Sequence, residues 1–179
     1  MIGRIGRNAI CAGAILAATG AWAQTANESK NRVAVNADWS VFAASNPKEC
    51  WGVSSPKSSV NTRGGKPTQV NRGDILLFVT FRPGGLPGGE ISFTGGYPFA
   101  PKSTATLEIN GNKYELFTEG DWAWPRTPAD DSGLLDALKK GSEAVITAHS
   151  ARGTQTVDTF SLSGFTATLD DAQKHCAGK

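Results

Sequence analysis

Cysteine is the residue type with the widest chemical range in this sequence, and it occurs three times, at positions 11, 50 and 176. A thiol can form a disulfide, bind a metal or act as a nucleophile. None of the three belongs to a CxxC motif, so neither a thioredoxin-like redox site nor a ribbon-type zinc site is indicated. The surroundings of each cysteine therefore decide its role.

Cys11 lies in a segment with the features of a secretory signal peptide. Basic residues are followed by an apolar run rich in small residues, and Ala21-Trp22-Ala23 matches an A-x-A cleavage site. The apolar run is too short to cross a bilayer, which takes about 20 residues. We therefore predict a signal peptide at 1–23, in preference to an uncleaved anchor, and a mature chain without a transmembrane segment.

Cleavage of this signal leaves two cysteines, Cys50 and Cys176, in an exported chain. Oxidising compartments favour disulfides, and an even number of cysteines leaves no thiol over. We predict a Cys50–Cys176 disulfide that closes a loop over most of the mature chain. In the chain-entropy model such a loop contributes at most about 5 kcal/mol to stability.

The charge balance gives no support for a nucleic-acid partner. The full chain has 18 Lys and Arg against 16 Asp and Glu. Arg4 and Arg7 leave with the signal, so the mature chain has no net charge. Its basic residues are scattered among acids and form no basic stripe, so we predict no nucleic-acid partner.

A hydrolytic triad can be drawn from His149, Ser150 and Asp158, but no nucleophile elbow of the G-x-S-x-G type frames any serine. We expect His149 to be a strand residue at a sheet edge and His175 to be exposed. The sequence therefore predicts no catalytic residue, and an envelope hydrolase using His149 is the less favoured alternative.

Metal and cofactor sites are not predicted either. Asp130 and Asp131 lack the EF-hand pattern, and they suit the capping of a helix better than the binding of calcium. Two isolated histidines cannot form a dedicated zinc site.

The elements that must position these residues are mostly strands. Alternating apolar and polar residues predict strands at 38–44, 50–55, 74–82, 90–94, 103–109, 113–119, 142–150 and 154–165. Asn110-Gly111 predicts a hairpin. One short helix is predicted at 129–141, in a connection, and 169–176 favours a short helical turn at the C-terminus. Many short strands indicate an all-β sandwich or barrel rather than a parallel α/β fold. We predict a flexible leader at 24–36 and one β domain at 37–179.

Rigid aromatic residues gather in and near proline-bearing segments: Tyr97, Phe99, Trp122 and Trp124. The two tryptophans are two residues apart, so on a strand they share a face. Such side chains either plug the open end of a sandwich or form a binding surface.

Several segments resemble the invasion-associated locus B family: ADWSVF, PKECWGVSSPK, DILLFVTFRPG, FTGGYPFAP, ELFTEGDWAWP and RGTQTVDTFSLSGFT before a terminal cysteine. The resemblance covers roughly residues 37–176. It implies an immunoglobulin-like β-sandwich that an alphaproteobacterium exports to its periplasm or surface. For pathogenic members of the family, the resemblance implies a role in virulence, in which the protein assists entry into host cells. It implies no catalytic residues.

We therefore expect a secreted, non-enzymatic envelope protein that is periplasmic or associated with the cell surface. We expect it to bind an envelope or host-surface protein or glycan through the loop end that holds Tyr97, Phe99, Trp122 and Trp124. A structural or chaperone-like periplasmic module is the alternative; an exposed sheet edge able to take a client strand would favour it.

Overall fold

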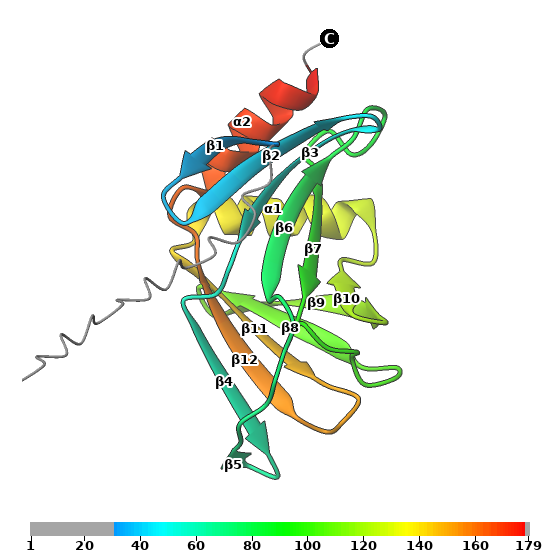
Figure 1. Ribbon diagram of the computed structural model, residues 1–179, viewed down its shortest axis with the longest axis vertical. Helices are drawn as coiled ribbons and strands as arrows, with labels where there is room; N and C mark the ends of the chain where they lie inside the picture. The colour runs from blue at the N-terminus through cyan, green and yellow to red at the C-terminus, as the bar shows by residue number, and fades with distance from the viewer. Residues whose placement is uncertain (1–30, 178–179) are drawn as a thin grey trace, which may run out of the picture.

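The computed structural model describes residues 31–177, so the predicted signal peptide and most of the predicted leader lie outside the described residues. The described chain forms one antiparallel sheet of twelve strands in the order β1-β2-β3-β6-β7-β10-β9-β8-β11-β12-β4-β5, with two helices (Figure 1). The elements are β1 (Arg32–Asn36), β2 (Trp39–Ser45), β3 (Lys48–Ser54), β4 (Ser58–Arg63), β5 (Lys66–Pro67), β6 (Leu76–Phe81), β7 (Glu90–Thr94), β8 (Thr104–Ile109), β9 (Asn112–Glu119), β10 (Trp122–Trp124), α1 (Pro128–Lys140), β11 (Glu143–His149), β12 (Gln155–Ser161) and α2 (Phe165–Ala177). Within 31–177, neither helix has the length and apolar character needed to cross a membrane.

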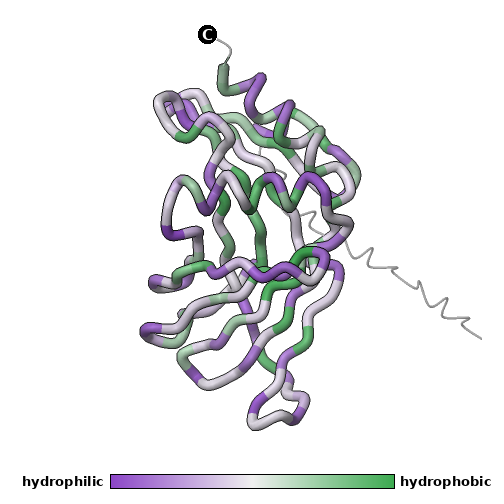
Figure 2. Tube along the Cα trace, turned by 180° about the vertical axis from the view of Figure 1, so that it is seen from behind, coloured by the Kyte–Doolittle hydropathy of each residue, from purple (hydrophilic) through white to green (hydrophobic). Residues whose placement is uncertain are grey.

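The sheet bends so that its two halves face each other across a core. In Figure 1, β1, β2, β3, β6 and β7 run in a different direction from β8, β9, β11, β12 and β4. Phe93 on β7 packs edge-on against Phe160 on β12, with ring centroids 6.0 Å apart, although these strands are not neighbours in the sheet. Hydrophobic residues concentrate in the middle of the strands, and hydrophilic residues at the hairpin tips (Figure 2). The predicted all-β, sandwich-like fold is confirmed.

The strand predictions hold where apolar alternation is strong. On β6, Leu77, Val79 and Phe81 are buried, and the strand lies between β3 and β7. Asn110 and Gly111 have φ values of 50° and 80° and connect β8 to β9, as the hairpin signal predicted. Strands β4 and β5 were not predicted, because their residues are mostly polar and exposed and carry no core pattern.

Residues 32–36, which the sequence placed in a flexible leader, instead form β1 and pair with β2. Val33 and Val35 are 42% and 59% exposed, so their alternation does not mark a core-facing strand. The strand is held by the ladder with β2 and by Asn36, whose Nδ2 donates to Asp171 of α2 at 2.9 Å. The folded domain therefore begins before residue 37.

The C-terminal helix is longer than predicted and replaces the end of a predicted strand. β12 stops at Ser161, and α2 starts at Phe165 directly after Gly164. The buried residues of α2 follow helical spacing: Phe165, Thr168, Leu169 and Ala172. Trp39 packs against Phe165 at 4.9 Å and donates from Nε1 to the Ser161 carbonyl at 3.0 Å. α2 thus covers the inner side of β1, β2 and β3.

Helix α1 is predicted correctly, but its cap differs. Thr127 is the N-cap: its Oγ1 accepts from the Asp130 N–H at 3.3 Å, and its own N–H donates to the Asp130 carboxylate at 3.1 Å. Asp131 turns inward instead and accepts the Ile91 N–H at 2.9 Å. Asp130 therefore caps helix α1, and Asp131 binds the backbone of strand β7. Among residues 31–177, no group of three or more His, Cys, Asp or Glu could hold a metal ion.

Candidate binding sites: an outer aromatic face and an arginine pocket

The four aromatic residues predicted as one binding surface do not form one surface: they lie in three different places. Phe99 is only 6% exposed and packs against Phe93 and Tyr97, with centroids 6.1 and 5.2 Å apart. It plugs the core. Trp122 and Trp124 share the outer face of β10, and Trp122 is 42% exposed. Tyr97 is half-buried and lines a separate pocket.

The tryptophans of β10 belong to a larger set of aromatic side chains on the outer side of the sheet. The set forms three ring pairs, with centroids 5.5, 5.6 and 4.7 Å apart: Phe42–Trp51, Phe78–Trp122 and Phe117–Trp124. Each member alternates along its strand with buried residues of the inner side, so all six point outward. We call these six residues the outer aromatic face.

A shallow hollow of about 330 Å³ opens on this face among Trp51, Phe78 and Trp122. Its other lining residues are polar: Glu49, Thr80, Arg82 and Ser92. Ser92 lies directly opposite Phe78 across the β6–β7 ladder, where a small side chain leaves room between two aromatic rings. Arg82 forms ion pairs with Glu49 at 2.6 Å and with Glu90 at 2.5 Å. The hollow therefore combines aromatic walls with both donors and acceptors of hydrogen bonds.

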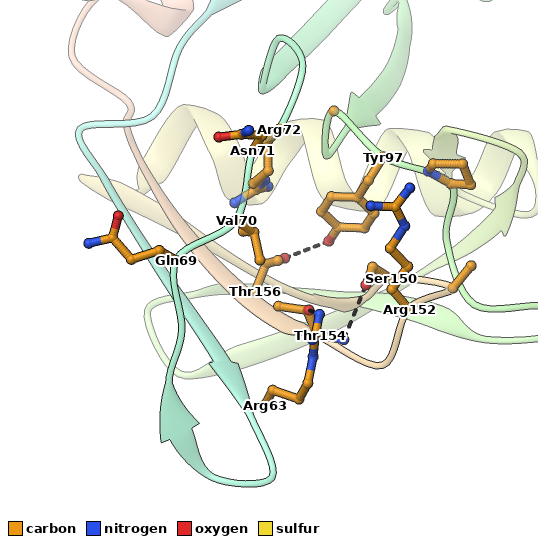
Figure 3. Close-up of a pocket in the computed structure, with 13 residues that line it drawn as sticks. Arg63, Gln69, Val70, Asn71, Arg72, Tyr97, Ser150, Arg152, Thr154 and Thr156 are labelled. Atoms are coloured by element: carbon orange, nitrogen blue, oxygen red, sulfur yellow. Dashed lines mark hydrogen bonds between the residues drawn. The ribbon is translucent and has the colours of Figure 1, made fainter.

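A second cavity, of about 470 Å³, has Tyr97 among its lining residues (Figure 3). Three arginines line it, Arg63 from the end of β4, Arg72 from the segment before β6 and Arg152 from the β11–β12 turn. We call it the arginine pocket. The remaining lining residues are Gln69, Val70, Asn71, Gly96, Tyr97, Pro98, Ser150, Ala151, Thr154 and Thr156.

Hydrogen bonds within the arginine pocket hold its walls. The Tyr97 hydroxyl and Thr156 Oγ1 are 2.6 Å apart, and the Arg72 guanidinium lies 5.0 Å from the centre of the Tyr97 ring. Arg63 Nη2 donates to Thr154 Oγ1 at 2.8 Å, and the Thr154 N–H donates to Ser150 Oγ at 3.1 Å. Burial raises the pKa of the Tyr97 phenol above its ordinary value of 10.0, so this group stays neutral at physiological pH.

Sequence reasoning missed the arginine pocket because Arg152 lies far along the chain from Arg63 and Arg72. Arg63 and Arg152 each precede a glycine with positive φ, Gly64 and Gly153. That pattern marks two turn tips, but it does not indicate that the tips converge.

The two cysteines predicted to form a disulfide lie next to each other. Cys50 is buried on β3, and Cys176 is half-buried on α2; both are thiols in this structure. Burial raises the pKa of Cys50 to about 12, and a hydrogen bond with Cys176 adds to the increase. The Cys176 thiol also lies 3.3 Å from the Phe81 carbonyl oxygen. The disulfide remains a prediction for the oxidised protein.

The residues of the drawn triad have other partners. The Asp158 carboxylate accepts from Arg72 and from Ser59 Oγ, and the Ser150 hydroxyl accepts from the Thr154 backbone. His149 is exposed at the end of strand β11, opposite Gln155, but β11 lies between β8 and β12, so the expectation of a sheet edge is wrong. This arrangement gives no support to the hydrolase alternative.

One comparison with known proteins agrees with the sequence resemblance, and it is a match to a family model. No match is found among curated proteins or among solved structures. Residues 91–173 match the family model for Invasion associated locus B (IalB) protein. The matched segment extends from β7 into α2, and it contains Trp122, Tyr97 and Arg152 but not Arg63 or Arg72. This match supports the assignment of the chain to the invasion associated locus B family.

Proposed function

We propose that this chain is an exported envelope protein that acts by binding, without a catalytic step, and that its outer aromatic face receives a glycan of the envelope or of a host cell surface. The observation that carries the proposal is the exposure of Trp122, 42%, beside Phe78 in a hollow with polar lining. Leaving apolar area in water costs about 25 cal/mol per Å². Exposed apolar patches rimmed by polar residues are typical of interaction sites.

The chemistry of the hollow favours a sugar over an apolar ligand. A sugar ring has C–H faces that stack on aromatic rings, and hydroxyl groups at its edge that both donate and accept hydrogen bonds. Trp51 and Trp122 offer such ring faces. The guanidinium of Arg82 is a donor, and the carboxylate of Glu49 is an acceptor that the ion pair already orients.

Binding of the purified chain to polysaccharide fractions from its own envelope and from host cells tests the proposal. We expect binding to survive protease treatment of the fraction and to be lost after periodate oxidation of its sugars. Replacing both Trp122 and Trp124 with Ala should abolish binding, because the stacking surface on β10 is removed. Val60→Ala, at another exposed apolar position, is the matched control and should bind normally.

Two outcomes would contradict the proposal. Binding that is sensitive to protease but not to periodate would assign the face to a protein partner. If the double tryptophan variant loses its cooperative thermal unfolding, these side chains serve the fold and not a ligand.

Export itself is part of the proposal and rests on the predicted signal peptide at 1–23. Cell fractionation followed by intact-mass measurement should find the chain outside the cytoplasm and beginning at Gln24. A cytoplasmic chain that retains residues 1–23 would contradict this.

One observation favours the chaperone-like alternative. β1 lies at one end of the strand order within residues 31–177, and Val33 and Val35 are exposed on it. An edge strand can accept a client strand through main-chain hydrogen bonds. Replacing Val35 with Pro removes a backbone donor. It should weaken client binding under this alternative and leave glycan binding unchanged under our proposal.

A further inference from the structure

We propose that the arginine pocket binds a small organic anion, a sugar that carries a carboxylate or a phosphate group. This site shares no lining residue with the hollow on the outer aromatic face, so the inference does not depend on the proposed function.

The charge of the lining is the first argument. None of the described residues that line the pocket is acidic, whereas three are arginines. Asp158 offsets the charge of Arg72, but this carboxylate is fully buried behind the pocket wall. Arg63 and Arg152 are exposed, and they leave the pocket with an excess of positive charge. Guanidinium groups match carboxylate and phosphate oxygens with paired hydrogen bonds.

The buried ion-pair network with Asp158 accounts for only one of the three arginines. Arg72 is needed to pair with Asp158 and to donate to the Gly95 carbonyl at 2.8 Å. Arg63 and Arg152 do not take part in that buried network. Placing their like charges around one cavity costs electrostatic free energy, which an anion in the cavity would offset.

The pocket is also preorganised for a ring-shaped ligand. The Tyr97 ring is held by Phe99, by Arg72 and by the hydroxyl contact with Thr156. In Figure 3 the side chain of Arg152 extends toward Tyr97, whereas Arg63 reaches toward Thr154. A ligand between them meets an aromatic surface on one side and cationic donors around it. Preorganised groups lose little freedom on binding, which favours affinity.

The volume, about 470 Å³, lies within the range of small-molecule sites and is far too small for a folded partner. A hydroxyl group from Ser150 and an amide group from Asn71 add uncharged hydrogen-bonding partners of the kind that a sugar requires. Together, these features favour an anionic sugar over an inorganic anion alone.

Calorimetric titration of the purified exported chain tests the proposal with four probes, glucuronate, glucose 6-phosphate, glucose and inorganic phosphate. We expect at least one anionic sugar to bind more tightly than either glucose or phosphate. Arg63→Ala and Arg152→Ala should each weaken that binding about tenfold, because each removes a charge-assisted contact. The affinity should fall as salt is added.

Lys113→Ala is the matched control: it removes an exposed cation of β9 that lies outside the pocket, and it should not change the affinity. Arg152→Glu is a second variant, at an exposed turn position, and it should abolish binding while thermal unfolding stays cooperative. The tryptophan variants of the outer aromatic face should bind the anionic sugar normally, which separates this test from that of the proposed function.

Three results would overturn the proposal. If glucose binds as tightly as the anionic sugars, the site does not recognise the anionic group. If inorganic phosphate binds as tightly as they do, the site does not recognise the sugar. Binding of an anionic sugar that is unchanged in both arginine variants would place the site elsewhere.

Discussion

Arg72 and Asp158 form a buried ion pair with two parallel hydrogen bonds. Arg72 Nη1 lies 2.8 Å from Oδ1, and Nη2 lies 2.6 Å from Oδ2. The Asp158 side chain is fully buried, and that of Arg72 is 6% exposed. The pair joins the segment before β6 to β12, and Ser59 on β4 donates to the same carboxylate at 2.7 Å. One wall of the arginine pocket therefore rests on this pair.

Breaking this ion pair from one side should destabilise the protein strongly. Arg72→Met leaves an uncompensated buried carboxylate, which costs about 3–5 kcal/mol in comparable pairs. Urea unfolding followed by fluorescence measures the change. The double variant with Arg72→Met and Asp158→Leu should recover much of this loss, because no charge then remains buried. A loss below about 1 kcal/mol in the single variant would show that the carboxylate finds another partner.

The natively produced protein should contain the Cys50–Cys176 disulfide. Its intact mass without reductant should be lower than that of the reduced chain by two hydrogen atoms, and alkylation should label neither cysteine. Reduction should lower the free energy of unfolding by about 2–5 kcal/mol, because the unfolded chain loses a long-range crosslink. Two freely labelled thiols in unreduced material would contradict the prediction.

Once reduced, the two thiols should differ in reactivity. Cys50 is buried and its pKa is raised to about 12, so it holds almost no thiolate near neutral pH. We expect Cys176 to be alkylated first, with Cys50 reacting only after unfolding. Peptide mapping after a short alkylation pulse distinguishes the two sites; equal labelling would mean that β3 and α2 separate readily.

Gly164→Ala should disturb the contact between β1 and the turn that leads into α2. A Cβ at this position would lie 2.0 Å from the Asn36 carbonyl oxygen, and the backbone has a φ of 90°. Gly153→Ala is the matched control, because φ is 76° there but nothing lies within 4 Å of the added atom. The control should lower the free energy of unfolding by about 1 kcal/mol, because alanine is strained in a left-handed backbone conformation. Gly164→Ala should lower it by about 2 kcal/mol more, because its Cβ also overlaps the Asn36 carbonyl. Thermal unfolding measures both, and equal costs would show that β1 moves aside without loss.

Asp131 should make stability depend on pH. Burial raises its pKa above the ordinary value of 3.8. The folded chain therefore takes up a proton at higher pH than the unfolded chain. The stability linked to this group is fully present below 3.8 and is lost as pH rises through the folded pKa. Asp131→Asn keeps an acceptor for the Ile91 N–H and removes the charge. The free energy of unfolding of this variant should therefore change less with pH on the acidic side.

Asp131→Ala provides the contrast. It leaves the buried Ile91 N–H without an acceptor, which costs about 1–3 kcal/mol at any pH. Urea unfolding at several acidic pH values compares the three proteins. Parallel profiles for the native and Asn proteins would show that Asp131 does not titrate in this range.

Local chemistry explains which parts of the fold were predictable from the sequence. Alternating side chains mark β6, and Asn110-Gly111 marks the β8–β9 hairpin, because both signals act between residues close in the chain. β1 and β4 were missed for the same reason, since a polar or outward-facing strand is stabilised by its neighbours and not by its own pattern.

The amino-acid sequence alone determined a β-rich, sandwich-like domain, a family resemblance, and the fact that Trp122 and Trp124 share one face of a strand. Only the tertiary structure decided that Phe99 fills the core, that Trp122 meets Phe78, and that Arg63, Arg72 and Arg152 surround one pocket. The physical reason is that periodicity within a strand specifies which side chains share a face. Which strands become neighbours depends on packing and hydrogen bonding between residues far apart in the chain.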